Sequence, residues 1–291
     1  MTGLTTHIEI SGDGFMTESA TGGAAVHIPK TTWTTPRELR RLEISATLCL
    51  VFIWALLVCT FAGWLHPAVL LIAPLLYIRF ELNAHELIHA CRASDLNPIV
   101  RYIPAGQSIY HMGYEGYRRN HLDHHRFVGT KDGPERYLVE GPGWLAAIKS
   151  VGCIDVAALR YWRLYHKSFT WRDYLEALFH AAVFVGLLMW NWRVFLIYFV
   201  SLRVLVGLAD FFFHRSLHTE GDLIARWFRR IDKAYPWLFG CWLGRNMTSI
   251  LVWHDEHHRY PRVSARYLPE VQSLAGQTDR APEVAPESAT A

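Results

Sequence analysis

The sequence predicts an all-α integral membrane protein, with four transmembrane helices in two hairpins and a helical cytoplasmic cap. Two observations predict this fold. Apolar residues gather in long runs that carry almost no charge, and eight of the 16 histidines gather in three compact groups. A run of about 20 apolar residues crosses the hydrocarbon core of a bilayer as a helix, and imidazole is a common metal ligand. We therefore expect the cap to hold a di-metal site.

The clearest transmembrane helix is expected at residues 44–65, which carry no formal charge. Pro67 then marks a tight turn, and the next span is expected at residues 68–83. A second hairpin is expected from spans at residues 174–190 and 194–213. The alternative for each run is a buried helix of a soluble protein, and this alternative is weakest for the first run.

Basic residues are found mainly on one side of the expected hairpins. Arginine and lysine flank the outer ends of the four spans, whereas the two short turns hold only Arg193. Because basic loops stay in the cytoplasm, both termini and the long middle loop are expected there. Within the fourth span, Arg203 and Asp210 are expected to pair with each other or with neighbours, since an unpaired charge is costly in a membrane.

The remaining composition sets the domain boundaries. Residues 1–36 and 273–291 are rich in small and polar residues and are predicted to be disordered tails around a membrane domain at 37–272. Residues 144–172 are expected to form a helix along the membrane interface. The net charge of +3 lacks the dense basic stripe of a nucleic-acid-binding protein. Five cysteines without a CxxC pair exclude a disulfide framework.

The three histidine groups have spacings that bring side chains together on a helix. Residues three and four apart project from the same helix face, so each HxxHH sequence should aim three imidazoles one way. One mononuclear site cannot use eight imidazoles, so two metal ions are implied, and Fe, Zn, Cu or Ni would all suit this ligand. With four crossings, all three groups emerge on the cytoplasmic side. The predicted ligands are His85, His89, His121, His124, His125, His254, His257 and His258.

Further residues near these groups have possible supporting roles. His214 and His218 directly follow the fourth span and could complete the coordination, with interfacial positions as the equal alternative. Ligating imidazoles usually donate their other N–H to a carboxylate. The carboxylates placed for this role are Glu86, Asp123, Asp255 and Glu256.

The order HxxxH, HxxHH and HxxHH resembles the membrane-bound fatty acid desaturase and hydroxylase superfamily. The sequence HLDHHRFVG at residues 121–129 is similar to the second histidine box of fatty-acyl and sphingolipid desaturases. The sequence HDEHHRYPRVSARYLPEV at residues 254–271 is similar to their third box and also to that of carotenoid ketolases. The resemblance covers most of the chain, and only the boxes are specific.

The resemblance implies a non-haem di-iron centre, held by the eight box histidines, with O₂ as co-substrate. It implies oxidation of an unactivated C–H bond in a lipid-like substrate, with fatty acyl desaturation expected first and hydroxylation or ketolation of a carotenoid, sphingolipid or alkane as the alternative. The chain has no motif for a redox cofactor of its own. We therefore expect a separate electron donor of the ferredoxin, rubredoxin or cytochrome type.

Two other classes of function compete with this hypothesis. The first box also matches HExxH, in which two histidines bind zinc and Glu86 would be the general base of an intramembrane protease. This alternative leaves both HxxHH boxes unexplained. A metal transporter or sensor is the other alternative, although its ligands would be expected along a path inside the spans.

Overall fold

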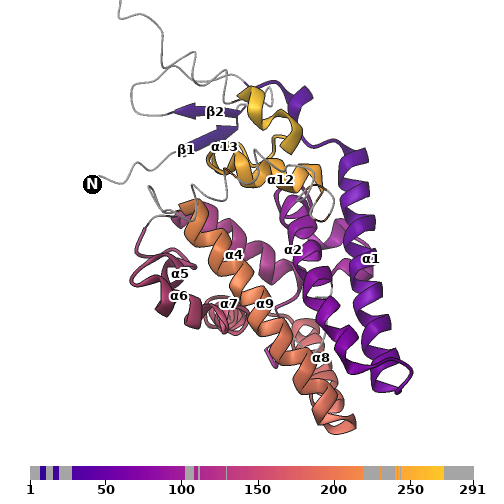
Figure 1. Cartoon of the computed structure of the whole chain (residues 1–291). Coiled ribbons are helices and arrows are strands. Elements are labelled where there is room, and N and C mark those ends of the chain that lie inside the picture. Colours follow the sequence, from indigo (N-terminus) through magenta and orange to yellow (C-terminus); the bar gives the residue numbers. More distant parts are fainter. Residues whose placement is uncertain are drawn as a thin grey trace, which may run out of the picture.

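The computed structural model describes residues 7–10, 16–19, 28–101, 108–110, 112–128, 130–218, 230, 240, 242 and 244–271. The long helices are α1 (Pro36–Phe61), α2 (Ala73–Ala90), α8 (Trp171–Trp190) and α9 (Trp192–His218), and the 3-10 helix η2 (Pro67–Ile72) leads directly into α2. Figure 1 shows the α1–η2 and α8–α9 connections at one end of the bundle and the C-terminal helices at the other.

Four helical segments in the described part of the chain are long and apolar enough to cross a membrane. They are Pro36–Phe61, Pro67–Ala90, Trp171–Trp190 and Trp192–Arg215, so the predicted all-α membrane fold with four spans is confirmed. The helices extend beyond the apolar runs, because local caps set their ends. For example, α1 begins at Pro36 because the Thr35 hydroxyl accepts the Glu38 N–H at 3.3 Å and the Glu38 carboxylate accepts the Thr35 N–H at 2.8 Å.

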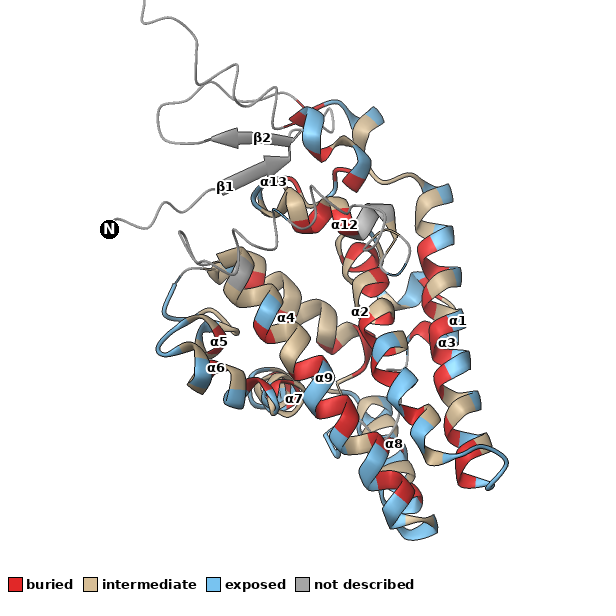
Figure 2. Ribbon diagram, viewed as in Figure 1, coloured by how far each residue is buried: buried red, intermediate tan, exposed pale blue. Residues whose placement is uncertain are grey.

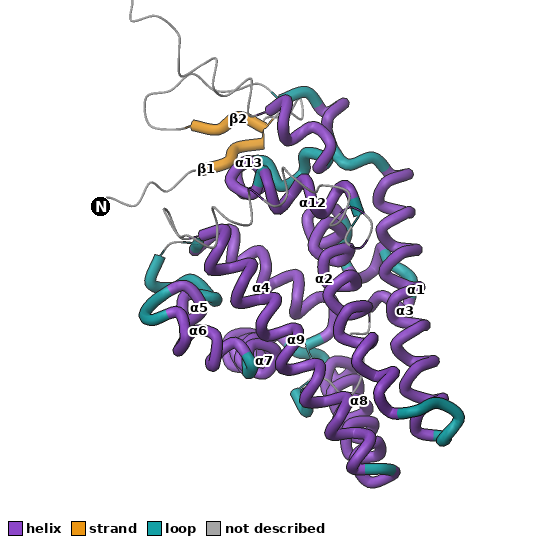
Figure 3. Tube along the Cα trace, viewed as in Figure 1, coloured by secondary structure: helices purple, strands orange, loops and turns teal. Residues whose placement is uncertain are grey.

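Shorter helices fill the rest of the described chain, and helices dominate Figure 3. The region expected as one interfacial helix at residues 144–172 forms two main helices, because the chain turns at Val151 and Gly152. A two-stranded antiparallel pair lies near the N-terminus. The elements are β1 (His7–Ile10), β2 (Met16–Ser19), α3 (Pro98–Arg101), α4 (Gly113–Phe127), α5 (Arg136–Val139), α6 (Gly143–Ser150), α7 (Cys153–Tyr165), α12 (Arg245–Val252) and α13 (His254–Arg259).

The main apolar core lies where α2 packs between α1 and α9. Leu50 and Ile53 of α1, Leu87 of α2, and Tyr198 and Leu202 of α9 are fully buried in one cluster. Figure 2 shows buried residues on the facing sides of these helices and exposed residues on their outer sides. Helix α8 packs less closely than the other three and leaves most of its apolar side chains exposed. Such exposed apolar faces suit a lipid environment.

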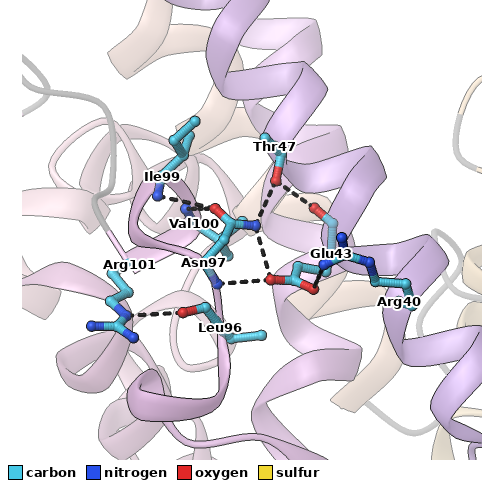
Figure 4. Close-up of polar contacts among 8 residues, drawn as sticks. All are labelled: Arg40, Glu43, Thr47, Leu96, Asn97, Ile99, Val100 and Arg101. Carbon is cyan, nitrogen blue, oxygen red and sulfur yellow. Dashed lines mark hydrogen bonds and ion pairs between the residues drawn. The ribbon is translucent and has the colours of Figure 1, made fainter.

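A polar network joins the N-terminal half of α1 to the segment that follows α2 (Figure 4). The buried Glu43 carboxylate accepts the Asn97 backbone N–H at 2.7 Å and the Asn97 side-chain N–H at 2.8 Å. It also pairs with Arg40 at 2.8 Å, while Asn97 donates to the Thr47 hydroxyl at 3.0 Å. A carboxylate with this many donors is satisfied despite its burial, so the segment after the first histidine box has a fixed position.

Residues 28–35 contact the loop that follows the third histidine box. Thr34 N–H donates to the Arg262 carbonyl at 3.0 Å, and Ser264 N–H donates to the Thr32 carbonyl at 2.8 Å. Ile28 is fully buried in the cluster that contains Leu268. These residues belong to the region expected as a disordered tail. Most of that region, and all of residues 273–291, lies outside the described residues, so the rest of the prediction stays untested.

The two charged residues of the fourth span pair with neighbours rather than with each other. Arg203 donates to the Asp155 carboxylate of α7 at 2.9 Å and lies over the Phe199 ring at 4.5 Å. Asp210 forms a hydrogen bond with the Cys153 thiol. Helix α7 therefore supplies a polar partner to each of these residues.

Candidate metal centre

The histidines of the three boxes lie together in two clusters at one end of the helical bundle. Within each cluster, one ring nitrogen from every residue lies within 4.8 Å of all the others. The five-histidine cluster consists of His85, His89, His121, His125 and His257. The four-histidine cluster consists of His124, His218, His254 and His258.

Each HxxHH box contributes to both clusters. In each box, the first and last histidines enter one cluster and the middle histidine enters the other. A helix turns about 100° per residue, so positions i and i+4 are about 40° apart, whereas i+3 and i+4 are about 100° apart. The expectation that all three imidazoles of a box point the same way is therefore only partly met. His124 belongs to the four-histidine cluster, whereas His121 and His125 belong to the five-histidine cluster. His257 belongs to the five-histidine cluster, whereas His254 and His258 belong to the four-histidine cluster.

Side chains of α4 align the first two boxes. Arg118 donates its Nε to the Ile88 carbonyl at 3.2 Å, and the Tyr114 hydroxyl donates to the Cys91 carbonyl at 3.2 Å. These acceptors lie at the C-terminal end of α2, where carbonyls lack partners within the helix. The bonds satisfy the end of α2 and hold His85 and His89 beside His121.

The third box is held from its C-terminal side. The Ser249 hydroxyl of α12 donates to the Ala265 carbonyl at 2.6 Å, and the Ser264 hydroxyl donates to the Glu38 carboxylate at 3.1 Å. Arg266 pairs with the same carboxylate at 3.4 Å. The loop after α13 is therefore attached both to α12 and to the start of α1, which fixes His254, His257 and His258 over the other boxes.

The distances between ring nitrogens fit binding to shared metal ions. In the five-histidine cluster, the Nε2 atom of His121 lies 3.1 Å from that of His89 and 2.9 Å from that of His125. In the four-histidine cluster, Nε2 of His258 lies 3.2 Å from that of His124 and 3.0 Å from that of His254. Two nitrogens bound at right angles to one ion at about 2.1 Å lie about 3.0 Å apart.

Hydrogen bonding alone cannot account for these contacts. A neutral ring nitrogen carries either one proton or one lone pair, so Nε2 of His121 or His258 cannot satisfy two close nitrogens at once. His257 is fully buried, and neither of its ring nitrogens has a hydrogen-bond partner. Buried polar atoms without partners are rare in proteins. The donor set therefore fits metal ions better than it fits a hydrogen-bonded core.

The protonation of the rings also suits metal binding. Burial, and next the neighbouring imidazoles, lower the pKa of His121, His257 and His258 well below the ordinary value. The pKa of His125 and that of His254 are lowered by the same causes. The rings are therefore neutral at pH 7, and neutral imidazole is the form that binds a metal.

Two carboxylates contact ligand-type histidines directly. Glu86 lies 3.3 Å from Nδ1 of His85, as its position in the first box predicts. Glu135 lies 2.7 Å from Nδ1 of His124. Burial raises the pKa of Glu135, but the nearby His124 and the hydrogen bond between them lower it below its ordinary value overall. Such carboxylates orient the ring and raise its basicity.

Glu135 was not among the residues expected from the sequence, because it lies ten residues after the second box with no helical spacing to it. The other expected carboxylates lie elsewhere. Asp123 accepts from the Tyr165 hydroxyl at 3.0 Å and pairs with Arg160 at 3.5 Å. Asp255 is exposed and Glu256 half-buried, and no hydrogen bond or ion pair described for residues 244–271 joins either carboxylate to a histidine ring.

The two histidines after the fourth span have different positions. His218 belongs to the four-histidine cluster, with its Nε2 3.3 Å from that of His254. His214 forms a separate group with His124 and Glu135, and its Nδ1 lies 2.8 Å from the Asp210 carbonyl. His218 thus joins the eight box histidines as the ninth member of the two clusters, whereas His214 lies beside the four-histidine cluster.

A cavity of about 180 Å³ opens beside both clusters. One water needs about 10–15 Å³ on a comparable scale, so the cavity accommodates a larger ligand. Its walls combine histidines of both clusters with apolar side chains from two of the membrane helices, α2 and α9, and from α12. The apolar lining includes Ile78, Leu82, Phe213, Leu217, Ile250 and Leu251.

The fold and the site define an integral membrane protein with a histidine-rich candidate metal centre next to an apolar cavity. The chain belongs to the fatty acid desaturase family, whose sequence model matches residues 62–284. Membership implies an oxidoreductase that acts on lipid-like substrates. Comparisons with curated proteins and with solved structures return no match.

Proposed function

We propose that this protein uses two iron ions and O₂ to oxidise an unactivated C–H bond, and that the reaction is the desaturation of a fatty acyl chain. The observation that carries the proposal is the pair of histidine clusters that line one cavity. Nine histidines in two groups exceed what a single mononuclear site can use. Family membership directs the choice toward oxidation of a lipid-like substrate.

The five-histidine and four-histidine clusters would each hold one iron. When bound, the ions supply the electrons that split O₂ and the oxidising power that removes hydrogen from the chain. Glu86 and Glu135 orient His85 and His124 through their Nδ1 atoms. The apolar wall at Leu82 excludes water from the reacting carbon.

The cavity supports an apolar chain as the substrate. Its walls include residues of α2 and α9, which are membrane spans, so a chain can reach the histidines from the bilayer. Hydroxylation or ketolation begins with the same hydrogen removal as desaturation, and the product mass separates these outcomes. We retain desaturation as the proposal, on the likeness of the second and third boxes.

The electron donor is proposed to be a separate ferredoxin, rubredoxin or cytochrome-type protein. The basic residues that flank the spans support a cytoplasmic position for the site and both termini, because basic loops are retained there. A donor with an acidic surface would dock on this basic face, since complementary charge guides such encounters. The purified chain should therefore be inactive with NAD(P)H alone.

The geometry does not favour the two competing classes. An HExxH protease needs Glu86 free to act on a bound water, but Glu86 is buried against His85 and does not line the cavity. The first-box histidines also share their cluster with three others. For a transporter, the histidines would follow a path through the spans rather than gather at one end.

The test combines metal analysis with product analysis. Protein purified anaerobically should contain about two irons per chain with a coupled Mössbauer spectrum. When supplied with a lipid extract, O₂ and an electron donor, it should give products two mass units lighter than the substrate. Products sixteen or fourteen units heavier would replace desaturation by hydroxylation or ketolation. A single zinc without iron would refute the proposal.

A further inference from the structure

Four polar residues of the cavity wall share one spacing relative to the histidines. Each lies four residues before a histidine on the same helix, and four residues advance about 6 Å along a helix axis. Side chains four apart also lie on the same face. The cavity therefore has a polar layer one helical turn from the histidines. The pairs are Glu81–His85 on α2, Tyr117–His121 and Asn120–His124 on α4, and Asp210–His214 on α9.

The two carboxyl groups of this layer retain unused acceptor capacity. Glu81 forms a hydrogen bond with the Tyr77 hydroxyl, and Asp210 forms one with the Cys153 thiol. None of the ion pairs described for residues 28–218 includes either group. A carboxyl group has about four acceptor positions, so both can accept further hydrogen bonds from a ligand.

Asn120 provides independent evidence that the layer is built to bind a polar group. Its side chain is 5% exposed and lines the same cavity. Its Nδ2 donates to the Ala157 carbonyl at 2.9 Å and contacts the Met112 sulfur at 3.1 Å, whereas its buried Oδ1 has no partner. A buried polar atom left unpaired is destabilising. A ligand that donates a hydrogen bond would remove this cost.

Donors line the cavity as well. Burial, and next the acidic groups of the cavity, raise the pKa of Tyr117, so its phenol keeps its proton. Burial likewise raises the pKa of Tyr137. In the part of the chain that the structure describes, no hydrogen bond uses the hydroxyl of Tyr117 or that of Tyr137. Arg160 also lines the cavity, and its Nε is buried without a partner.

We propose that this polar layer binds a hydroxyl group carried by the substrate chain and holds it one helical turn from the histidines. A hydroxyl both donates and accepts, so it matches carboxyl, amide and phenol groups together. An ammonium has no acceptor, so it would leave the phenols and the Arg160 Nε without a partner. A plain methylene chain would leave the whole layer unsatisfied.

The inference rests on the proposed function and narrows its substrate to an acyl or alkyl chain with a hydroxyl close to the reacting carbon. The layer would also fix the position of oxidation. The hydroxyl would be held about 6 Å from the histidines. The reacting carbon would therefore lie only a few carbons along the chain from the carbon that carries the hydroxyl. The polar layer consists of Glu81, Tyr117, Asn120, Tyr137 and Asp210.

The test measures binding by the full chain in lipid nanodiscs without metal. Dodecan-1-ol, dodecane and dodecylamine have one chain length and differ only in the end group, and calorimetry gives their dissociation constants. We expect the alcohol to bind at least about tenfold more tightly than the alkane or the amine. Glu81→Gln, Tyr117→Phe and Asp210→Asn should each weaken alcohol binding about tenfold and leave alkane binding unchanged.

Tyr174→Phe is the matched control, because Tyr174 lies on α8 outside the cavity wall and is exposed. Its alcohol binding should equal that of the unmodified chain. Tyr137→Phe keeps the test decisive if a carboxyl variant fails to fold. Equal binding of alcohol and alkane would overturn the inference. Tighter binding of the amine, or an alcohol preference untouched by every folded variant, would also overturn it.

The outcome is separable from that of the proposed function. If the chain binds two irons and oxidises plain acyl chains without preferring the alcohol, the hydroxyl site is refuted and the oxidase proposal stands. If alcohol binding follows the variants but no iron is bound, the hydroxyl site stands and the oxidase proposal is refuted.

Discussion

Replacing Gly207 with alanine tests how closely α9 packs against the connection between α6 and α7. A Cβ atom at Gly207 would lie 2.8 Å from the Ser150 carbonyl carbon and 2.9 Å from Val151 Cα. Unstrained carbon contacts are about 3.5–4.0 Å. The obstructing atoms belong to the backbone, so they cannot rotate away. The helices must therefore separate by roughly 0.5–1 Å.

The expected magnitude combines two opposed effects. Overpacking of a tight contact costs about 1–3 kcal/mol, and a backbone obstruction belongs in the upper half of that range. Alanine also gains about 1 kcal/mol of helix propensity over glycine. The net effect of Gly207→Ala is a loss of about 1–2 kcal/mol. Gly186 of α8 is the matched control, since nothing lies within 4 Å of its added Cβ.

Gly186→Ala should therefore stabilise the chain by up to about 1 kcal/mol. Thermal unfolding in nanodiscs measures both variants, and at about 2–4 °C per kcal/mol the two melting temperatures should differ by roughly 2–12 °C. Gly207→Ala should also weaken binding in the cavity, because α7 supplies Cys153 and Ile154 to its wall. A Gly207→Ala chain that melts at or above the temperature of the unmodified chain would refute this packing argument.

Three further predictions concern the metal centre. His257→Ala should lower iron content and abolish turnover, whereas the exposed His166→Ala should retain both; full activity of His257→Ala would remove that residue from the ligand set. Glu135→Gln should weaken iron binding about 10–100-fold, measured by competition with a chelator, while exposed Asp255→Asn should have little effect. The metal-free chain should lose stability as pH falls below 6.5, the ordinary imidazole pKa, because the unfolded chain then binds protons that the buried rings do not. Each such ring contributes up to about 1.4 kcal/mol per pH unit, so a melting temperature that stays constant from about pH 7.5 to about pH 5.5 would contradict the lowered pKa values.

The membrane helices were predictable because long apolar runs have one stable solution in a bilayer. Their ends were not, since capping by Thr35 and Glu38 starts α1 eight residues before the apolar run. The contacts of residues 28–35 were also missed. Their partners lie more than 200 residues away in sequence, and no local composition records such pairing.

The box histidines were predictable as a group because helical spacing of ligands is local. Their division into two clusters was not, since it depends on how α4 and α13 face each other. Glu135 illustrates the same limit: its contact with His124 arises from the path of the chain between α4 and α5 rather than from any motif. The spacing of the polar layer, four residues before the histidines, is visible in the sequence. Only the structure shows that these residues line one cavity.

The crossing of the middle histidines has a consequence for metal loading. Because α4 and α13 each supply histidines to both clusters, under the proposed function the first ion to bind would restrict the motion of two helices that also build the second site. The second ion then meets ligands that are already ordered, and the entropy of ordering them is not lost again. Iron should therefore enter in pairs: at half the saturating amount of iron, chains with two ions and chains with none should outnumber chains with one.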